Sequence, residues 1–496
     1  MAQQNLSIFS SSSLVESQQH THNDCFSFCK MHGLGNDYLY IDCCFGNGHS
    51  NPSENDFRKF IKHLNIGPNE NDENGSLSNH HHHPNTHSYT LEHIIQKLCH
   101  RNFGIGADGV IFITTPNLEL LEENTIQSSS SHNNTTIHCR MEMYNSDGSS
   151  GEMCGNGLRC VAQYACDRLI AMKKIEKNQI SHHERFSNVQ YGYHVRVQSH
   201  RKVYDCICYA GVEEEGNKKR QQLCHDENYF IVHDQILLVA TTPTNHTLWV
   251  EIEMGQLQTQ ASNFDMATDF ENPLMEVPLV NQEEGLVRKV LYHYTQQHVL
   301  KIPLYCLLVP NPHAICFVNE IGMNDKSSVF ETIWKDVNKI PLALVGSVIE
   351  NDREIFPQRT NVEFIEMMTD ALPTNVKKRE NRSTLIEMLE SNCVLRVRQR
   401  TWERGSGETN ACGTGAFAVS QLVYLRKFYG NGQNNEGTPS SSPPPVCTVQ
   451  VKLNGGDLYF NYDRRKQDDA TTMTRVNMIG PVTYVCNGSF RIFDFL

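Results

Sequence analysis

The chain has 496 residues, of which 39% are hydrophobic, and a formal net charge of −13 at pH 7. This length allows two or three domains with cores of their own, and the negative charge argues against nucleic acid and anionic membrane surfaces as partners. No apolar run approaches the roughly 18 residues of a membrane-spanning helix, so we expect no membrane partner.

The N-terminal residues 1–24 are rich in Ser, Gln and His and contain neither Lys nor Arg, which predicts a disordered tail. The tail lacks the charged and apolar regions of a signal peptide, and it is unlike an Arg-rich transit peptide. The chain contains 18 irregularly spaced cysteines, which favours reduced thiols over a disulfide framework. We therefore expect a cytoplasmic protein, with an organellar or plastid location left open.

Polar segments rich in Asn, Ser, Gln, His and Glu interrupt the rest of the chain, and they are typical of surface loops or disorder. The expected inserts are 46–88, 116–137, 176–190, 212–245, 258–298, 371–390 and 430–446. The first includes a run of four histidines (80–83), which we interpret as low-complexity sequence and not as a metal site, because no Cys or acidic ligand is spaced with it. Between the inserts we expect a first half over 25–247, a second half over 248–481, and a final strand over 482–496 that returns to the first half.

The denser segments predict strands with few helices. In the first half we expect a strand from Phe28 to Asp42 broken by a turn, a helix over 91–101, paired strands at 109–114 and 140–144, and a helix over 155–173. In the second half the predicted strands lie at 303–309, 313–319, 361–367, 394–402, 447–453 and 457–462, with a helix over 413–429. This is a strand-rich pattern that mixes α and β elements, with one principal helix in each half.

A Cys-Gly-x-Gly motif occurs at the start of both principal helices. Cys154 follows Met153 and Cys412 follows Ala411, and each lies nine residues after a polar residue, Asn145 in one case and Glu403 in the other. The repeat predicts one active site shared by the two halves, with a thiol on each side of the substrate. A racemase or epimerase that uses two bases needs this arrangement.

Cysteine suits this chemistry for a physical reason. The α-hydrogen of an amino acid is a very weak acid, so epimerisation without a cofactor needs a base on one face and an acid on the other. The same side chain serves as thiolate before the transfer and as thiol after it. Only roughly 3% of an ordinary thiol is ionised at pH 7, and a helix N-terminus favours the thiolate by about 0.3–1 kcal/mol or more. The backbone N–H groups there can also bind a carboxylate.

Six segments carry the most specific information, in order and spacing. They are Lys30–Asp37, Arg101–Gly109, Asn145–Gly157, Asn311–His313, Arg359–Asn361 and Glu403–Gly415. Together they resemble the diaminopimelate epimerase family, over the whole core from about Phe26 to the last strand. The resemblance implies an α/β fold of mixed sheets in two pseudo-symmetric halves, each a curved sheet around a central helix, with the active site in the cleft between them.

The resemblance also implies an activity and a set of site residues. It implies a pyridoxal-independent interconversion of LL- and meso-2,6-diaminopimelate in lysine biosynthesis, with no cofactor and no metal, in a monomer or homodimer whose partner is this small-molecule substrate. Cys154 and Cys412 would be the catalytic acid and base, and His313 and Glu403 would orient the thiols. The implied substrate-binding residues are Asn36, Asn145, Gly155, Asn156, Asn311, Asn361, Glu403, Arg404, Gly413 and Thr414.

One departure from the family and three alternatives remain at this point. Gly109 stands where some members have a substrate-binding Gln, so that contact is absent or replaced. A two-cysteine racemase of the proline or hydroxyproline type is the nearest alternative, and Arg404 with Asn145 and Asn361 favours a substrate with a second charged end instead. A non-catalytic binding protein would not need both cysteines, and a cysteine hydrolase would not explain the repeat. The sequence does not indicate which cysteine serves which isomer.

Overall fold

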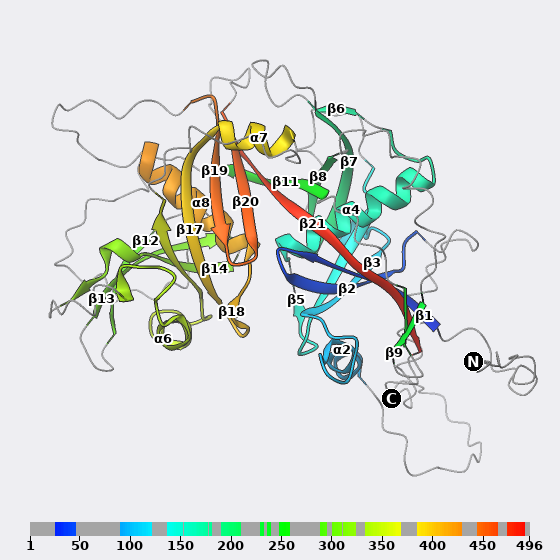
Figure 1. The fold of residues 1–496 in the computed structure, drawn as a ribbon, viewed down its shortest axis with the longest axis horizontal. Coiled ribbons are helices and arrows are strands. Elements are labelled where there is room, and N and C mark those ends of the chain that lie inside the picture. Colours follow the sequence, from blue (N-terminus) through cyan, green and yellow to red (C-terminus); the bar gives the residue numbers. More distant parts are fainter. Residues whose placement is uncertain are drawn as a thin grey trace, which may run out of the picture.

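The two halves of the chain form similar β-sheets, each wrapped around one long helix (Figure 1). A computed structural model describes most of the expected core. The described residues are 25–45, 90–121, 136–151, 153–176, 178–180, 190–209, 229–232, 236–239, 248–257, 288–294, 300–309, 311–323, 333–368, 384–428, 444–464 and 474–491. The N-terminal tail and the insert at 46–88, with its histidine run, lie outside these ranges.

The first half contains the following elements. They are β1 (Cys25–Gly33), β2 (Asn36–Asp42), α2 (Leu91–Cys99), β3 (Gly109–Thr114), η2 (Leu118–Leu120), β4 (Cys139–Asn145), β5 (Ser150–Gly151), α4 (Gly155–Ala171), β6 (Asn178–Ile180), β7 (Gln190–Ser199), β8 (Lys202–Tyr209), β9 (Tyr229–Val232), β10 (Ile236–Val239) and β11 (Leu248–Leu257).

The second half continues with a matching series. It consists of β12 (Arg288–Tyr294), β13 (Leu300–Val309), β14 (Asn311–Phe317), η6 (Val318–Glu320), β15 (Gly322–Met323), α6 (Leu342–Asn351), β16 (Asn361–Met367), α7 (Thr384–Ser391), β17 (Cys393–Glu403), β18 (Gly407–Thr409), α8 (Gly413–Phe428), β19 (Val446–Leu453), β20 (Gly456–Asp463) and β21 (Thr474–Arg491).

The strand pairings of the two halves repeat in the same sequence. In the first half β1 pairs with β2, β2 with β3, β3 with β4, β4 with β7, β7 with β8 and β8 with β11. In the second half β13, β14, β16, β17, β19, β20 and β21 follow one another in the same way. In both halves the second and fourth of these pairings are parallel and the others antiparallel. The expectation of two pseudo-symmetric halves built on curved mixed sheets is confirmed.

The long strand β21 joins the two sheets. Its first part pairs with β20 and β11, and its second part pairs with β1. Because β21 lies between β11 and β1, it closes the strands of the first half into a barrel around α4. In Figure 1 it runs from one sheet to the other. We expected the second half to begin at residue 248, which is the first residue of β11. Because β11 pairs with β8, this strand completes the first repeat of pairings instead.

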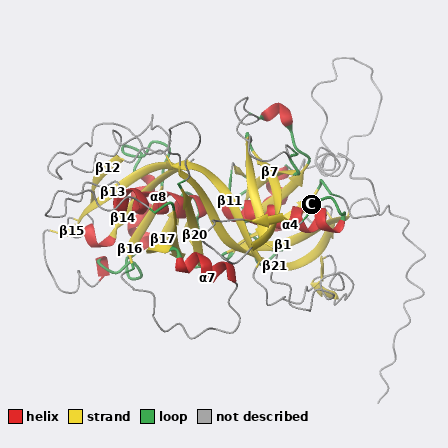
Figure 2. Cartoon of the chain, turned by 90° about the horizontal axis from the view of Figure 1, so that it is seen from above, coloured by secondary structure: helices red, strands yellow, loops and turns green. Residues whose placement is uncertain are grey.

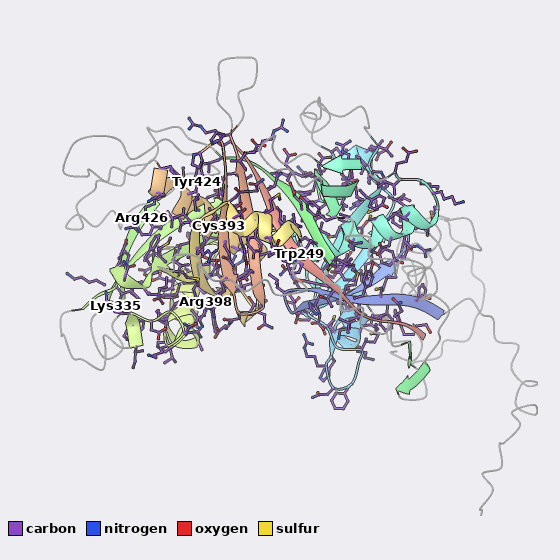
Figure 3. The ribbon with its side chains drawn as sticks, turned by 45° about the horizontal axis from the view of Figure 1, so that its top comes forward. Trp249, Lys335, Cys393, Arg398, Tyr424 and Arg426 are labelled. Atoms are coloured by element: carbon purple, nitrogen blue, oxygen red, sulfur yellow. The ribbon has the colours of Figure 1, made fainter. Side chains whose placement is uncertain are left out.

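The principal helices are buried because their sheets surround them. Helix α4 contacts β1, β7, β8, β11 and β21, and α8 contacts β13, β14, β16, β17 and β19. Seen from above, both helices lie among strands (Figure 2). Near the end of α8 the ring of Tyr424 stacks on that of Tyr462, with centroids 4.1 Å apart, and the guanidinium of Arg426 lies 4.4 Å from the ring centroid of Phe317 (Figure 3). The aromatic ring of Tyr424 and the aliphatic part of the Arg426 side chain extend the apolar packing to the end of the helix.

Most predicted elements are confirmed, and some of the expected loops are wrong. The helices predicted over 91–101, 155–173 and 413–429 correspond to α2, α4 and α8, and the strands at 109–114 and 140–144 pair as expected. Five expected inserts contain regular structure, because each polar segment includes a short run that forms a strand or a helix. The elements in question are β6, η2, β9, β10, β12 and α7. Among the described residues no helix is long and apolar enough to cross a membrane.

Candidate active site

The N-termini of α4 and α8 meet at the junction of the two halves. A Cβ atom placed on Gly413 would lie only 3.3 Å from the Cα of Gly155, so glycine at both positions permits the close approach of the two backbones. The side-chain amide of Asn156 donates a 3.0 Å hydrogen bond to the carbonyl of Ala411, in the loop before α8. Two sets of helix-terminal N–H groups thus face one region.

Cys154 is the N-cap residue of α4. Its Sγ accepts a 3.5 Å hydrogen bond from the N–H of Gly157, and the hydroxyl of Tyr38 donates to it from 3.6 Å. Burial raises the pKa of the Cys154 thiol, and the bonds from Gly157 and Tyr38 oppose that rise. These two donors favour the thiolate, as a helix N-terminus does in general.

Cys412 holds the equivalent position before α8 and is more deeply buried. Its Sγ lies 3.4 Å from the donating N–H of Gly415 and 3.5 Å from the hydroxyl of Thr414. Burial raises the pKa of this thiol well above its usual value, and the nearby carboxylates of Glu403 and Glu363 raise it further. A Cβ on Gly415 would lie 2.5 Å from Oε1 of Glu363 and 3.3 Å from Sγ of Cys412, so thiol and carboxylate converge there.

A buried polar cluster lies next to Cys412. The ring of His313 is 1% exposed, with Nδ1 2.8 Å from Oε1 of Glu363 and Nε2 3.0 Å from Oδ1 of Asn311. Glu403 accepts a 2.5 Å hydrogen bond from the hydroxyl of Thr409. Burial raises the pKa of Glu403, and its bonds with Thr409 and the thiol of Cys412 oppose that rise. The structure therefore brings two predicted residues, His313 and Glu403, to the side of one thiol.

Asn361, at the start of β16, lies next to Arg404, in the turn that follows β17. The side-chain oxygen of Asn361 accepts a 2.8 Å hydrogen bond from the backbone N–H of Arg404, and Asn361 is 3% exposed. The guanidinium of Arg404 instead donates to the carbonyl of Gln358 at 3.0 Å. The backbone of Arg404 is thus fixed at the end of β17, while its side chain contacts the loop before β16.

Asn36 and Asn145 lie at strand ends in the first half. Oδ1 of Asn36, at the start of β2, is buried and has no hydrogen-bond partner among the described residues. Asn145, at the end of β4, donates from Nδ2 to the hydroxyl of Ser149 at 3.0 Å. Among the described residues neither side chain hydrogen-bonds to a cysteine, so their placement rests on the strands that carry them. A buried amide oxygen without a partner is costly unless a ligand donates to it.

Gly109, the position at which the resemblance implies a Gln in some family members, has no room for a side chain. A Cβ at this position would lie 2.2 Å from the carbonyl oxygen of Tyr144 and 2.8 Å from the ring of Tyr38. No side chain larger than hydrogen fits without displacing backbone. The Tyr38 ring fills this space, and its hydroxyl reaches Cys154.

Sequence reasoning missed two residues of this site, Glu363 and Tyr38. Each lies two positions after a predicted residue on the same strand, Asn361 on β16 and Asn36 on β2. Because alternate residues of a strand point to the same face, that spacing could have identified them. Among the described residues, no group of three His, Cys, Asp or Glu side chains could hold a metal ion.

Comparison with known proteins gives consistent matches. The family model described as diaminopimelate epimerase matches residues 83–185. The diaminopimelate epimerase of Bacillus cytotoxicus is 26% identical over 466 residues, covering 94% of this chain and 97% of that protein. That of Methanococcus maripaludis is 24% identical over 465 residues, covering 94% and 99%, and that of Brachyspira hyodysenteriae is 27% identical over 440 residues, covering 88% and 92%.

Two solved structures are similar at low identity. A hydroxyproline epimerase from Agrobacterium vitis, with trans-4-hydroxy-L-proline bound, has a TM-score of 0.41 and 9% identity, covering 94% of this chain and 93% of that one. A probable proline racemase from Agrobacterium radiobacter has a TM-score of 0.39 and 10% identity, covering 93% and 92%.

The sequence relatives define the chain as an enzyme of the isomerase class, an epimerase. The resemblance carried by the six motifs is confirmed, because the family model described as diaminopimelate epimerase matches part of the chain and relatives of that name align with most of it at about 25% identity.

Proposed function

We propose that the protein interconverts LL-2,6-diaminopimelate and meso-2,6-diaminopimelate, a step of lysine biosynthesis, by a two-base proton transfer between Cys154 and Cys412 without a cofactor. The observation that carries the proposal is the pair of thiols at the starts of two helices whose first residues touch. The family matches support the choice of diaminopimelate as the substrate.

The reaction balances with the two thiols alone. The thiolate of one cysteine takes the α-hydrogen as a proton, and the electron pair of the broken C–H bond stays on the α-carbon and its carboxylate. The thiol of the other cysteine then gives its proton to the opposite face of that carbon. One C–H bond breaks and one forms, no electrons are lost, and proton exchange with water restores the two cysteines.

Backbone amides of the two helix starts would hold the α-carboxylate. We assign this role to Gly155, Asn156, Gly413 and Thr414, the first helical residues of α4 and α8. Their N–H groups would also stabilise the charge that develops on the carboxylate during proton removal, because fixed dipoles at a buried site need no reorganisation. The raised pKa values of both thiols make each thiolate a stronger base towards a weak carbon acid.

Polar side chains would hold the rest of the substrate. Diaminopimelate carries a second ammonium and a second carboxylate at its far end, and Asn side chains can bind either group. Arg404 would release the carbonyl of Gln358 and bind the distal carboxylate with two parallel hydrogen bonds. We assign the remaining contacts to Asn36, Asn145, Asn311, Asn361 and Glu403, with His313 orienting the Cys412 thiol.

The organisation of the chain fits one active site in each copy. We propose that the first half runs from residue 25 through β11, because β11 completes the first repeat of pairings, and that the second half ends with β21. Each half then supplies one cysteine, and the protein can act as a monomer or homodimer. Sixteen cysteines of the described part are in the thiol form, which fits a cytoplasmic location.

The test is a substrate panel with the purified protein and EDTA, with no cofactor added. LL-diaminopimelate, L-proline and trans-4-hydroxy-L-proline are each incubated with the enzyme, and the isomers are separated by chiral chromatography. We expect meso-diaminopimelate to form and the two cyclic amino acids to remain unchanged. Turnover of proline without turnover of diaminopimelate would identify the other type of racemase, and turnover of none would indicate a binding protein.

A further inference from the structure

A fully buried arginine stands behind the first turn of α4. Arg159 is 0% exposed, and its guanidinium donates from Nη2 to Oδ1 of Asn156 at 2.7 Å and from Nη1 to the carbonyl of Gly155 at 3.3 Å. Nη1 also lies 3.7 Å from the sulfur of Met478, and Nε has no hydrogen-bond partner within the described part of the chain. The described residues therefore give this cation no carboxylate.

The surrounding backbone is shaped to admit the guanidinium. A Cβ on Gly33 of β1 would lie 2.8 Å from Nη2, and one on Gly480 of β21 would lie 2.8 Å from Nε. Glycine at both positions lets two strands pack against the planar group. Burial lowers the pKa of Arg159, yet an arginine in a protein stays protonated. A buried charge without a counter-ion is unfavourable for folding alone, so a function is the natural explanation.

A chain of hydrogen bonds connects Arg159 to both cysteine loops. Arg159 fixes the side-chain oxygen of Asn156, and the amide nitrogen of Asn156 donates to the carbonyl of Ala411, the residue before Cys412. The same guanidinium lies on the helix that Cys154 caps. The positive charge thus adds to the positive end of α4, where a carboxylate or thiolate would be stabilised.

We propose that Arg159 is a positioning residue for the epimerisation. It fixes Asn156 and, through it, the loop before Cys412, and its uncompensated charge favours an anion at the start of α4. This role rests on the proposed function for its substrate, but its effect on the thiols can be measured without substrate.

The test compares Arg159→Met, which removes the charge and the donors, with Arg159→Lys, which keeps the charge. Arg168→Met, in the last turn of the same helix, is the matched control, because Arg168 lies beside Asp42 at 3.6 Å, away from the cysteines. The readouts are kcat and KM for diaminopimelate, and the pH dependence of iodoacetamide alkylation, resolved for each cysteine by peptide mapping.

Cys154 is the thiol whose alkylation profile reports on Arg159. The other titratable groups around it are Tyr38 and Tyr40 from β2, Glu403 from β17, and Cys160 from α4. All are retained in the three variants. A change in the alkylation profile of Arg159→Met that is absent in Arg168→Met can therefore be attributed to the buried guanidinium.

For Arg159→Met we expect kcat/KM to fall about 100-fold, the scale of losing one preorganised electrostatic contact, and alkylation of Cys154 to begin at higher pH. For Arg159→Lys we expect alkylation close to wild type but a raised KM, because one ammonium cannot replace both donors. If Arg159→Met does not fold, the KM of Arg159→Lys tests the proposal, and we expect it to be raised.

Two results would overturn the proposal. One is a folded Arg159→Met with a wild-type alkylation profile and a kcat/KM within about threefold of wild type. The other is an Arg159→Lys with unchanged KM. If the wild-type enzyme does not turn over diaminopimelate, the proposed function fails, while the alkylation profiles still test the effect of Arg159 on the thiol.

Discussion

Glu350 gives a sharp test of how the loop that carries Arg404 is held. This carboxylate lies on α6, is 3% exposed, and accepts hydrogen bonds from the indole N–H of Trp402 at 2.7 Å and from the backbone N–H of Gly405 at 2.8 Å. It also forms an ion pair with Arg359, in the loop before β16. One buried side chain thus joins both segments around Arg404, and its contacts with Arg359, Trp402 and Gly405 do not involve a cysteine.

The contacts set the magnitude expected for Glu350→Ala. Truncation removes the acceptor of two partly buried hydrogen bonds, from Trp402 and Gly405, and the counter-ion of Arg359. Removing one partner of a buried charge pair costs about 3–5 kcal/mol. Arg359 is 28% exposed, so water recovers part of this, and we expect the free energy of unfolding to fall by about 2–4 kcal/mol. Glu350→Gln keeps one acceptor oxygen and should lose about 1–2 kcal/mol.

The assay combines urea unfolding with steady-state kinetics. Because the turn after Trp402 loosens, we expect KM for diaminopimelate to rise about tenfold in Glu350→Ala, while alkylation of Cys154 stays as in wild type. Glu354→Ala, just after the same helix, is the control, because its side chain is exposed. A Glu350→Ala variant whose stability and KM both match wild type would refute the reasoning.

Three further predictions concern the site itself. Cys154→Ala and Cys412→Ala should each lower kcat at least about 1,000-fold, because one face of the α-carbon loses its proton-transfer group, and wild-type turnover by either variant would contradict the two-base assignment. Glu363→Gln removes a negative charge beside Cys412 and should lower the pKa of that thiol, so its alkylation should begin at lower pH while that of Cys154 is unchanged; an unaltered Cys412 profile would show that the carboxylate does not act on it. Arg404→Lys should raise KM about tenfold for diaminopimelate, and an equal loss for a monocarboxylic amino acid would place Arg404 away from the distal carboxylate.

Much of the fold could be predicted because its signals are local. The glycines and apolar periods that start α4 and α8 lie within a few residues of Cys154 and Cys412. The pairing of β3 with β4 follows from two adjacent strand patterns. Strands β9, β10 and β12 were missed because these short, largely apolar runs lie within long polar segments. Strands β9 and β12 pair with their neighbours β10 and β13, whereas β10 also pairs with β21, which is distant in the sequence.

The site could be predicted only where a motif carried it. Both cysteines, His313 and Glu403 were identified from short segments, and the structure brings the last two beside Cys412. The strand spacing could have pointed to Glu363, but the role of Arg159 depends on contacts between separate elements, so no local pattern reveals it. The same holds for Gly109, whose lack of a side chain follows from the neighbouring ring of Tyr38.

The central claim is that two different thiols serve the two faces of one α-carbon. The most direct measurement is epimerisation of LL-diaminopimelate in D₂O, stopped at early conversion, with deuterium located at the α-carbons by mass spectrometry and NMR. A two-base site predicts that the meso product carries one α-deuterium at the inverted centre, while the remaining LL substrate stays protiated. Deuterium that appears in the LL substrate as fast as in the product, or meso product without α-deuterium, would contradict the account.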